Sequence, residues 1–179
     1  DGAAGVGKTT TAKELAKKLG YQYFDTGAMY RAVTFFFLAE KVNINLGSKV
    51  KESLKAMNLQ IDFLSGSDMI ILLDGKDISL KIRNQEVTSH VSAVSALKEV
   101  RQMMVSIQRS ITEKGNFIVE GRDIGSVVFP DAKYKFYLTA DYNVRAKRRL
   151  VDFEKINEAK NINIIKKDLI ARDKYDSNR

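Results

Sequence analysis

A single stretch near the start of the chain limits the folds that it can adopt. Residues 2–9 read Gly-Ala-Ala-Gly-Val-Gly-Lys-Thr and fit the pattern G-x-x-x-x-G-K-[ST]. In such a loop successive backbone N–H groups point at one phosphate group, and the N-terminus of the following helix adds a partial positive charge. Apolar residues then recur at helical spacing until Gly20, at Ala12, Leu15, Ala16 and Leu19. The pattern predicts a phosphate-binding loop that opens a helix, the alternative being a glycine-rich turn before an ordinary helix.

Two side chains of this loop predict the chemistry of its ligand. Lys8 can bridge the outer phosphates of a nucleotide, and the hydroxyl of Thr9 can be a ligand of Mg²⁺. The central strand of a parallel sheet normally delivers a loop of this kind, and the sequence begins at Asp1. We therefore expect the intact protein to have a strand before this residue.

Beyond the loop, strand and helix patterns alternate. Short apolar runs predict strands at 21–24, 116–120 and 133–140, with helical patterns between them, which is typical of a parallel sheet flanked by helices. Between 59 and 82 the apolar runs are broken by Ser-Gly and Asp-Gly, which predicts a small antiparallel β-meander. The stretch 97–111 has one apolar helical face, and the polar stretch 142–179 is also predicted to be helical. The predicted fold class is α/β, in one domain.

Composition narrows the class of protein further. No apolar run approaches the roughly 18 residues of a membrane-spanning helix. The chain has no cysteine, which removes disulfides and thiolate metal sites and is consistent with a cytoplasmic location. Its 30 basic and 22 acidic residues give a net charge of +8. Such a charge suits nucleic acid, a membrane surface or small polyanionic substrates, although much of it comes from lysines spread over predicted helices.

A second motif follows the first predicted strand. Residues 24–33 read FDTGAMYRAV, which places Asp25, Thr26 and Gly27 at the end of the strand and Arg31 on a new helix. A hydroxyl, a glycine and an arginine at this edge of a sheet suit a second anionic ligand beside the first. The alternative is a helix cap by Asp25 or Thr26 with Arg31 on the surface.

With these motifs in place, the whole chain resembles the bacterial cytidylate kinases (CMP/dCMP kinases), a family of P-loop nucleoside-monophosphate kinases. The resemblance rests on six stretches in the order of that family: GAAGVGKTTTAKELAKKLG, DTGAMYRAV, IRNQEVTSHVSAVSALKEVRQMM, EGRDIGSVVFPDAKYKFYLTA, RAKRR and RDKYDSNR. It implies transfer of the γ-phosphoryl group of MgATP to CMP or dCMP, by a cytoplasmic monomer that needs neither nucleic acid nor a membrane.

The family resemblance also implies how the domain is divided. A core would comprise about 1–50 and 96–179, an NMP-binding insert with the antiparallel strands about 51–95, and a short mobile lid about 145–165. In this family the chain usually continues past RDKYDSNR with a further strand and helix, which we expect in the intact protein. Glu120 stands where the family often has aspartate, so a carboxylate is kept at that position.

The resemblance assigns the donor to the loop and the lid. The ATP phosphates would be held by residues of the loop, namely Gly2, Ala3, Ala4, Gly5, Val6, Gly7, Lys8, Thr9 and Thr10, with Thr9 on Mg²⁺. Arg145, Arg148 and Arg149 stand where lid arginines cover ATP in the family. Each of these three could instead belong to a solvated helix face.

The acceptor residues are also assigned by the resemblance. Arg31 and Arg122 would clamp the CMP phosphate, a bidentate task suited to guanidinium. Arg101 would donate to O2 and N3 of cytosine, while Ser92 and Asp123 accept from its N4 amino group. Arg172 and Asp176 would contact the ribose, and the remaining residues assigned to the acceptor are Thr26 and Arg83. Lys8, Arg122, Arg172 and Arg179 would form the catalytic group, with Arg179 near the transferring phosphoryl group.

Two other functions fit parts of the sequence. One is a P-loop kinase for another small acceptor, such as UMP, AMP or shikimate. The other is a nucleotide-binding regulator or basic RNA-binding protein that holds ATP without turnover, whose nucleic-acid affinity would fall steeply with salt.

Overall fold

The computed structural model describes residues 1–64, 69–154 and 160–177. The chain divides into two compact units, one made of Asp1–Thr11 with Arg122–Arg179 and the other of Ala12–Gly121. Helix α1 (Lys8–Leu19) begins in the first unit and continues into the second.

The larger unit contains the two parallel strands that the sequence predicts. Strands β1 (Gln22–Asp25) and β5 (Phe117–Glu120) pair in parallel, with Gln22 opposite Phe117 and Asp25 opposite Glu120. This register places the last residues of both strands side by side. Ligands of open α/β sheets bind beyond this carboxyl edge, so residues after Asp25 and Glu120 are positioned for such a role.

The predicted antiparallel meander is confirmed. Strands β2 (Leu59–Phe63), β3 (Met69–Leu73) and β4 (Lys76–Asp77) form an antiparallel sheet in that order. Asp74 and Gly75 between β3 and β4 have φ angles of +50° and +73°, as the Asp-Gly hairpin turn requires. The predicted break at Ser65-Gly66 lies outside the described residues.

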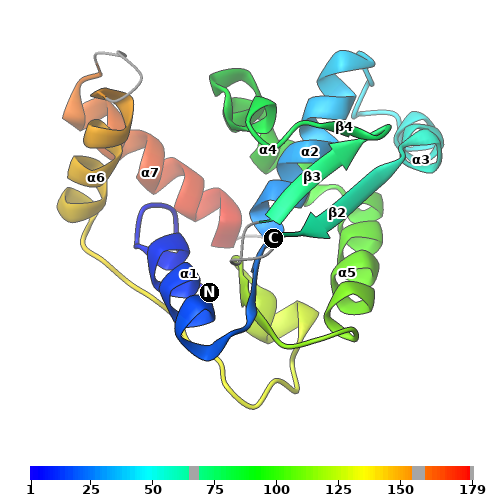
Figure 1. Cartoon of the computed structure of the whole chain (residues 1–179). Helices are drawn as coiled ribbons and strands as arrows, with labels where there is room; N and C mark the ends of the chain where they lie inside the picture. Colours follow the sequence, from blue (N-terminus) through cyan, green and yellow to red (C-terminus); the bar gives the residue numbers. More distant parts are fainter. Residues whose placement is uncertain (65–68, 155–159, 178–179) are drawn as a thin grey trace. The chain divides into compact units, whose positions relative to one another are not determined.

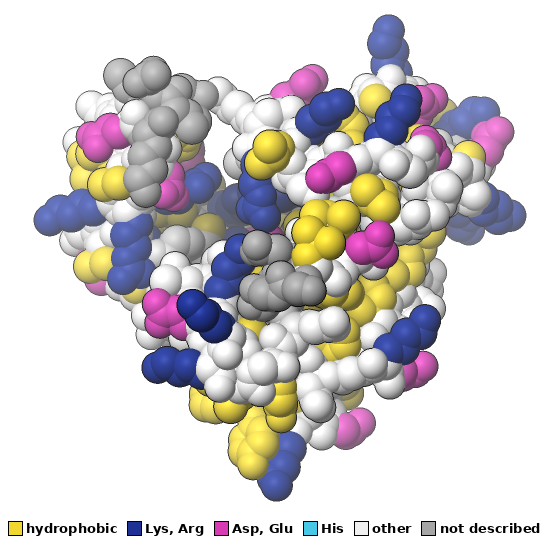
Figure 2. Space-filling view, in the orientation of Figure 1, with side chains coloured by type: hydrophobic (Ala, Val, Ile, Leu, Met, Phe, Trp, Pro, Cys, Tyr) yellow, Lys and Arg dark blue, Asp and Glu magenta, His cyan; other side chains and the backbone are white. Residues whose placement is uncertain are grey.

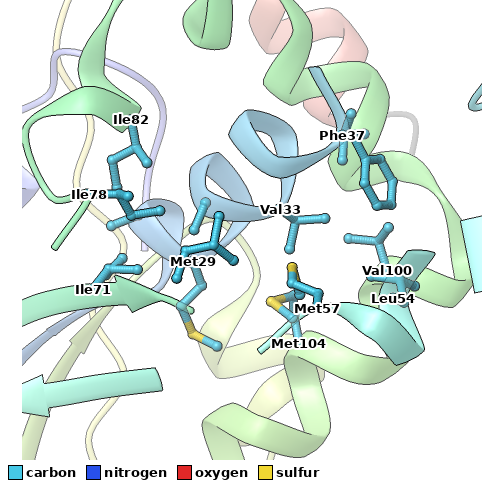
Figure 3. Packing of buried hydrophobic residues seen from close by; sticks show 14 of the residues in the cluster. Met29, Val33, Phe37, Leu54, Met57, Ile71, Ile78, Ile82, Val100 and Met104 are labelled. Atoms are coloured by element: carbon cyan, nitrogen blue, oxygen red, sulfur yellow. The ribbon is translucent and has the colours of Figure 1, made fainter. Parts of the chain in front are cut away.

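The core of this unit is built around one apolar helix. α2 (Thr26–Ala39) contributes Met29, Val33 and Phe37, which are at most 3% exposed. Figure 3 shows these side chains among apolar residues from α3 (Gly47–Ala56), β3 and α5 (Lys98–Thr112). Burial of each large apolar side chain stabilises the fold by about 1.5–3 kcal/mol, so α2 is held rigidly. α5 carries the apolar face predicted over 97–111, with Val100 and Met104 fully buried.

Between the meander and α5 the chain forms a short 3₁₀ turn, η1 (Lys81–Arg83), and helix α4 (Gln85–Ala96). The side chain of Asn84 accepts a hydrogen bond from the backbone N–H of Val87 at 2.8 Å and so caps α4. α4 packs against both α2 and α5. The position of α4 therefore depends on the same core that fixes α2.

The smaller unit is mainly helical, as predicted for 142–179. Helices α6 (Tyr142–Glu154) and α7 (Ile162–Ser177) lie side by side in Figure 1 and bury Ala146, Ile165 and Leu169 between them. A π-helical turn, η2 (Ile124–Val128), follows the Gly-Arg-Asp sequence. The carboxylate of Asp1 accepts hydrogen bonds from the backbone N–H groups of Ile124 and Gly125, at 2.8 and 2.7 Å, and so fixes this turn beside the first loop.

The segment 133–140, predicted as a strand, pairs in parallel with Asp1 and Gly2, the first residues of the given sequence. This segment makes one isolated parallel bridge, between Leu138 and Gly2, and Tyr134, Phe136 and Tyr137 are 67–72% exposed. An apolar run forms a strand only where a partner strand runs beside it for several residues. Among the described residues, this segment forms one β-bridge, between Leu138 and Gly2.

The surface carries the basic residues in small groups. On the face that Figure 2 shows, Lys and Arg side chains stand singly or in small clusters with Asp and Glu among them, so the net charge of +8 is not gathered into one band there. Among the described residues, no helix combines the length and the apolar character needed to cross a membrane.

Candidate active site

The glycine-rich loop adopts a conformation that requires its glycines. Gly2, Gly5 and Gly7 have φ angles of +144°, +74° and +101°. A Cβ atom on Gly2 would lie 2.4 Å from the backbone oxygen of Leu138. A side chain at Gly2 would therefore push the loop away from the segment that supports it. Directly after Gly7, helix α1 begins at Lys8, as the motif predicts.

Basic side chains bind four successive carbonyls of this loop. Arg122 Nη1 donates to the oxygen of Gly2 at 3.2 Å, Lys8 Nζ to Ala3 at 2.8 Å, Arg145 Nε to Ala4 at 2.7 Å and Arg148 Nη1 to Gly5 at 3.2 Å. The described peptides are all trans, and in a trans peptide the C=O and the following N–H point in opposite directions. Each N–H group of residues 3–6 therefore points away from the basic group that holds the preceding carbonyl, and N–H groups oriented in this way can donate to a phosphate group.

Helix α7 holds two of these arginines with carboxylates one turn apart. Arg122 Nε lies 3.5 Å from Asp176 Oδ2, and the guanidinium of Arg145 forms two hydrogen bonds with Asp173, at 2.6 and 2.9 Å. The structure thus brings together Arg122 and Asp176, both of which the sequence assigns to the acceptor. A role for Asp173 could not be predicted from the sequence, because its partner Arg145 lies 28 residues away along the chain.

The remaining basic candidates of this unit differ in position. Arg149 lies 3.6 Å from Asp152 in its own helix, and its guanidinium lies over the ring of Phe153. Arg172 is half-buried on α7. Arg179 and residues 155–159 of the expected lid lie outside the described residues.

In the larger unit, Asp25 and Thr26 stabilise the end of β1. Asp25 Oδ1 caps α2 by accepting from the N–H of Ala28 at 3.1 Å, and its Oδ2 lies 3.2 Å from Arg83 Nη2. The hydroxyl of Thr26 is buried and donates to the backbone oxygen of Glu120 at 2.8 Å. α2 therefore begins directly after β1, with Asp25 as its cap, which is the alternative that the sequence left open. The other carboxylate oxygen of Asp25 holds Arg83 at the same edge of the sheet.

Arg31 has a partner that sequence reasoning missed. Its Nη1 donates to the hydroxyl of Thr88 at 2.8 Å and lies 3.5 Å from the oxygen of Ile82. The hydroxyl of Thr88 in turn donates to the backbone oxygen of Asn84 at 2.8 Å, so its lone pair is directed at Arg31. A threonine on a polar helix gives no sequence signal of such a role, because the contact depends on how α2 and α4 pack.

We expect that replacing Thr88 by Val raises the KM for the acceptor nucleotide about three- to tenfold, the range of one neutral hydrogen bond. Val keeps the shape of the side chain but cannot accept from Arg31, so the guanidinium loses its fixed orientation. Steady-state kinetics with varied acceptor measures this effect. Thr112→Val is the matched control, since Thr112 on α5 also bonds backbone oxygens of its own helix. An unchanged KM for Thr88→Val would show that the bond does not position Arg31.

Ser92 and Arg101 lie on two helices that pack together, α4 and α5, and both are half-buried. Asp123 belongs to the other unit, is half-buried and directly precedes η2, whose N–H groups at Val127 and Val128 bond its backbone oxygen. A π-helical turn is often found at functional sites.

A glycine-rich loop at a helix start, surrounded by basic side chains, defines a phosphate-binding protein of the P-loop class. The model of the cytidylate kinase family matches residues 1–179. The chain is 46% identical over 179 residues to a cytidylate kinase of Clostridioides difficile, of which it covers 81%, and 42% identical over 180 residues to one of Bacillus thuringiensis, of which it covers 79%. It is also 42% identical to a bifunctional pantoate ligase/cytidylate kinase of Prochlorococcus marinus, of which it covers 35%. Each match covers 100% of this chain.

The chain therefore belongs to the cytidylate kinase family and is a phosphotransferase. This confirms the family and fold that the sequence motifs indicate.

Proposed function

We propose that this chain transfers the γ-phosphoryl group of MgATP to CMP or dCMP, which yields ADP and CDP or dCDP. The observation that carries the proposal is the loop of residues 2–9, with its positive φ angles and basic side chains on four carbonyls. Membership of the cytidylate kinase family supports the acceptor.

The donor phosphates are proposed to bind the loop N–H groups and Lys8. Lys8 Nζ, which bonds the oxygen of Ala3, would exchange this carbonyl for a phosphate oxygen. Thr9 is exposed in the first turn of α1, where its hydroxyl would hold Mg²⁺. Mg²⁺ usually takes one or two protein ligands beside phosphates and water, and when bound it neutralises the charge on the phosphates. The described residues contain no cluster of three or more His, Cys, Asp and Glu able to hold a metal by themselves.

The acceptor is proposed to be recognised by its charge and by its base. Arg31, Arg83 and Arg122 are proposed to supply guanidinium groups for the phosphate. Arg101 donates to O2 and N3 of cytosine, and Ser92 and Asp123 accept from its amino group. Uracil presents O4 and N3–H instead, so these polar groups would be left mismatched, which is costly.

This reaction demands positioning and charge neutralisation more than proton transfer. The attacking phosphate oxygen is already anionic, so the chain needs no strong base. Lys8 and the arginines would instead stabilise the charge that spreads over the transferring group. Water must be excluded, because water would otherwise accept the phosphoryl group.

A coupled assay of ADP release tests the proposal. The full chain is given MgATP with CMP, dCMP, UMP, AMP or no acceptor. We expect ADP release to depend on an acceptor and to be fastest with CMP or dCMP. Equal release without any acceptor would contradict the kinase function, and a preference for AMP would contradict the assignment of Ser92, Arg101 and Asp123 to cytosine.

We further infer that the chain acts as a monomer in the cytoplasm, without nucleic acid. The residues assigned to both nucleotides all come from one chain, so no second copy is needed to complete the set. Sedimentation of the active protein tests this inference, and a dimer would contradict it.

A further inference from the structure

Arg145 differs from the other arginines of α6 because its side chain is buried. Arg145 is only 3% exposed, whereas Arg148 three residues on is exposed. All three nitrogens of its guanidinium are engaged: Nε donates to the oxygen of Ala4, and the two terminal nitrogens donate to the two oxygens of Asp173. The guanidinium also lies over the ring of Tyr142, with its central carbon 4.8 Å from the centre of the ring. Three of the five N–H donors of the guanidinium are therefore used within the protein, and they fix its position and orientation.

The partner of Arg145 is equally constrained. The side chain of Asp173 is 15% exposed, and both of its oxygens accept from the same guanidinium. A fork-to-fork pair of this kind fixes the orientation of both groups and not only their distance. Burial opposes the charge on Arg145, but the hydrogen bonds and charge of Asp173 outweigh this effect and raise the pKa of the guanidinium above its ordinary value. Arg145 therefore stays charged.

The chain of contacts leads from α7 to one peptide of the phosphate loop. The C=O of Ala4 and the N–H of Gly5 belong to the same trans peptide and point in opposite directions. Arg145 holds the C=O on its own side, which directs the N–H of Gly5 to the opposite side. Gly5 has a φ angle of +74°, and because glycine has no Cβ its neighbouring peptides are less restricted in rotation than those of other residues. An external clamp on this peptide is therefore needed to keep the N–H in place.

We propose that Asp173 is a positioning residue for the donor phosphates, which acts through Arg145 on the Ala4–Gly5 peptide. The inference rests on the proposed function, because it assumes that the donor phosphates bind this loop. It adds a positioning role to the role in covering ATP that the family resemblance implies for Arg145. The clamp lowers the entropy that the loop loses when the phosphates bind.

The test measures binding of MgADP and of CMP to the full chain by calorimetry, with thermal unfolding in parallel. Asp173→Asn keeps the shape but removes the charge and one acceptor. We expect the Kd for MgADP to rise at least about tenfold, the effect of losing one charged hydrogen bond in a fixed site, with the Kd for CMP within about twofold. Asp168→Asn is the matched control, since Asp168 is exposed on the same helix.

A second variant separates positioning from stability. In the double variant Arg145→Met, Asp173→Leu the buried ion pair becomes an apolar contact, which often restores stability. We expect its unfolding midpoint to return toward wild type while its MgADP affinity stays at least about tenfold weaker, because the Ala4 carbonyl still lacks its donor. This variant decides the question even if Asp173→Asn does not fold.

Three outcomes would overturn the inference. The first is wild-type MgADP affinity in Asp173→Asn, and the second is recovery of affinity together with stability in the double variant. In both cases CMP phosphorylation by the wild type would leave the proposed function intact. The third is a wild-type chain that does not bind MgADP, which would overturn the proposed function as well.

Discussion

Replacing Lys8 by Met is expected to lower kcat for CMP phosphorylation at least about a thousandfold, which corresponds to about 4 kcal/mol of transition-state stabilisation. Met has nearly the length of Lys but no charge. The variant cannot neutralise the phosphate oxygens as the γ-phosphoryl group leaves ADP. It also leaves the oxygen of Ala3 without the bond that Lys8 supplies at 2.8 Å. Steady-state ADP release at saturating MgATP and CMP measures the effect.

Lys17→Met provides the control for this variant. Lys17 lies on the same helix α1 and is exposed, so its replacement removes one positive charge without touching the loop. We expect its kcat to stay within about twofold of wild type, as is usual for surface substitutions. A kcat of Lys8→Met within about tenfold of wild type would contradict the role of Lys8 as the cation on the transferring group.

The second large effect concerns recognition of the cytosine base of the acceptor. Replacing Arg101 by Ala is expected to raise the KM for CMP at least about a hundredfold, or about 2.7 kcal/mol, with the KM for ATP changed less than about threefold. The reason is that Arg101 is proposed to donate two hydrogen bonds, to O2 and N3 of cytosine. The preference for CMP over UMP should fall as well, because the polar groups that reject uracil then act without their main partner.

Arg109→Ala is the matched control for this variant. Arg109 lies on the same helix α5, and it is exposed where Arg101 is half-buried. Its replacement should leave both KM values near those of wild type. If the KM for CMP were unchanged in Arg101→Ala, recognition of the base would have to come from other residues.

Features that depend on neighbouring residues could be predicted from the sequence. The loop and the start of α1 follow from glycines and a lysine within eight residues, and the hairpin turn at Asp74-Gly75 follows from its two residues. The apolar face of α5 follows from its spacing. In each case the residues that determine the structure lie within one or two turns of each other.

Features that depend on distant partners could not be predicted in this way. The pairing of the segment 133–140 with Asp1 and Gly2 joins residues more than 130 positions apart. The contacts of Arg145 with Ala4 and Asp173 could not be predicted either, because these partners lie 141 and 28 residues away along the chain. Thr88 likewise becomes relevant only when α4 packs against α2.

The order in which the chain is synthesised affects when the four loop carbonyls of residues 2–5 can meet the basic side chains that bind them. The loop at residues 2–5 leaves the ribosome well before three of the side chains that bind its carbonyls, which belong to residues 122, 145 and 148. Domains generally fold as units during synthesis, and contacts of such large sequence separation form slowly because the intervening chain must first be closed into a loop. A nascent chain would therefore hold an unclamped loop until α6 emerged, and would acquire its full affinity for nucleotide only after α6 had been synthesised.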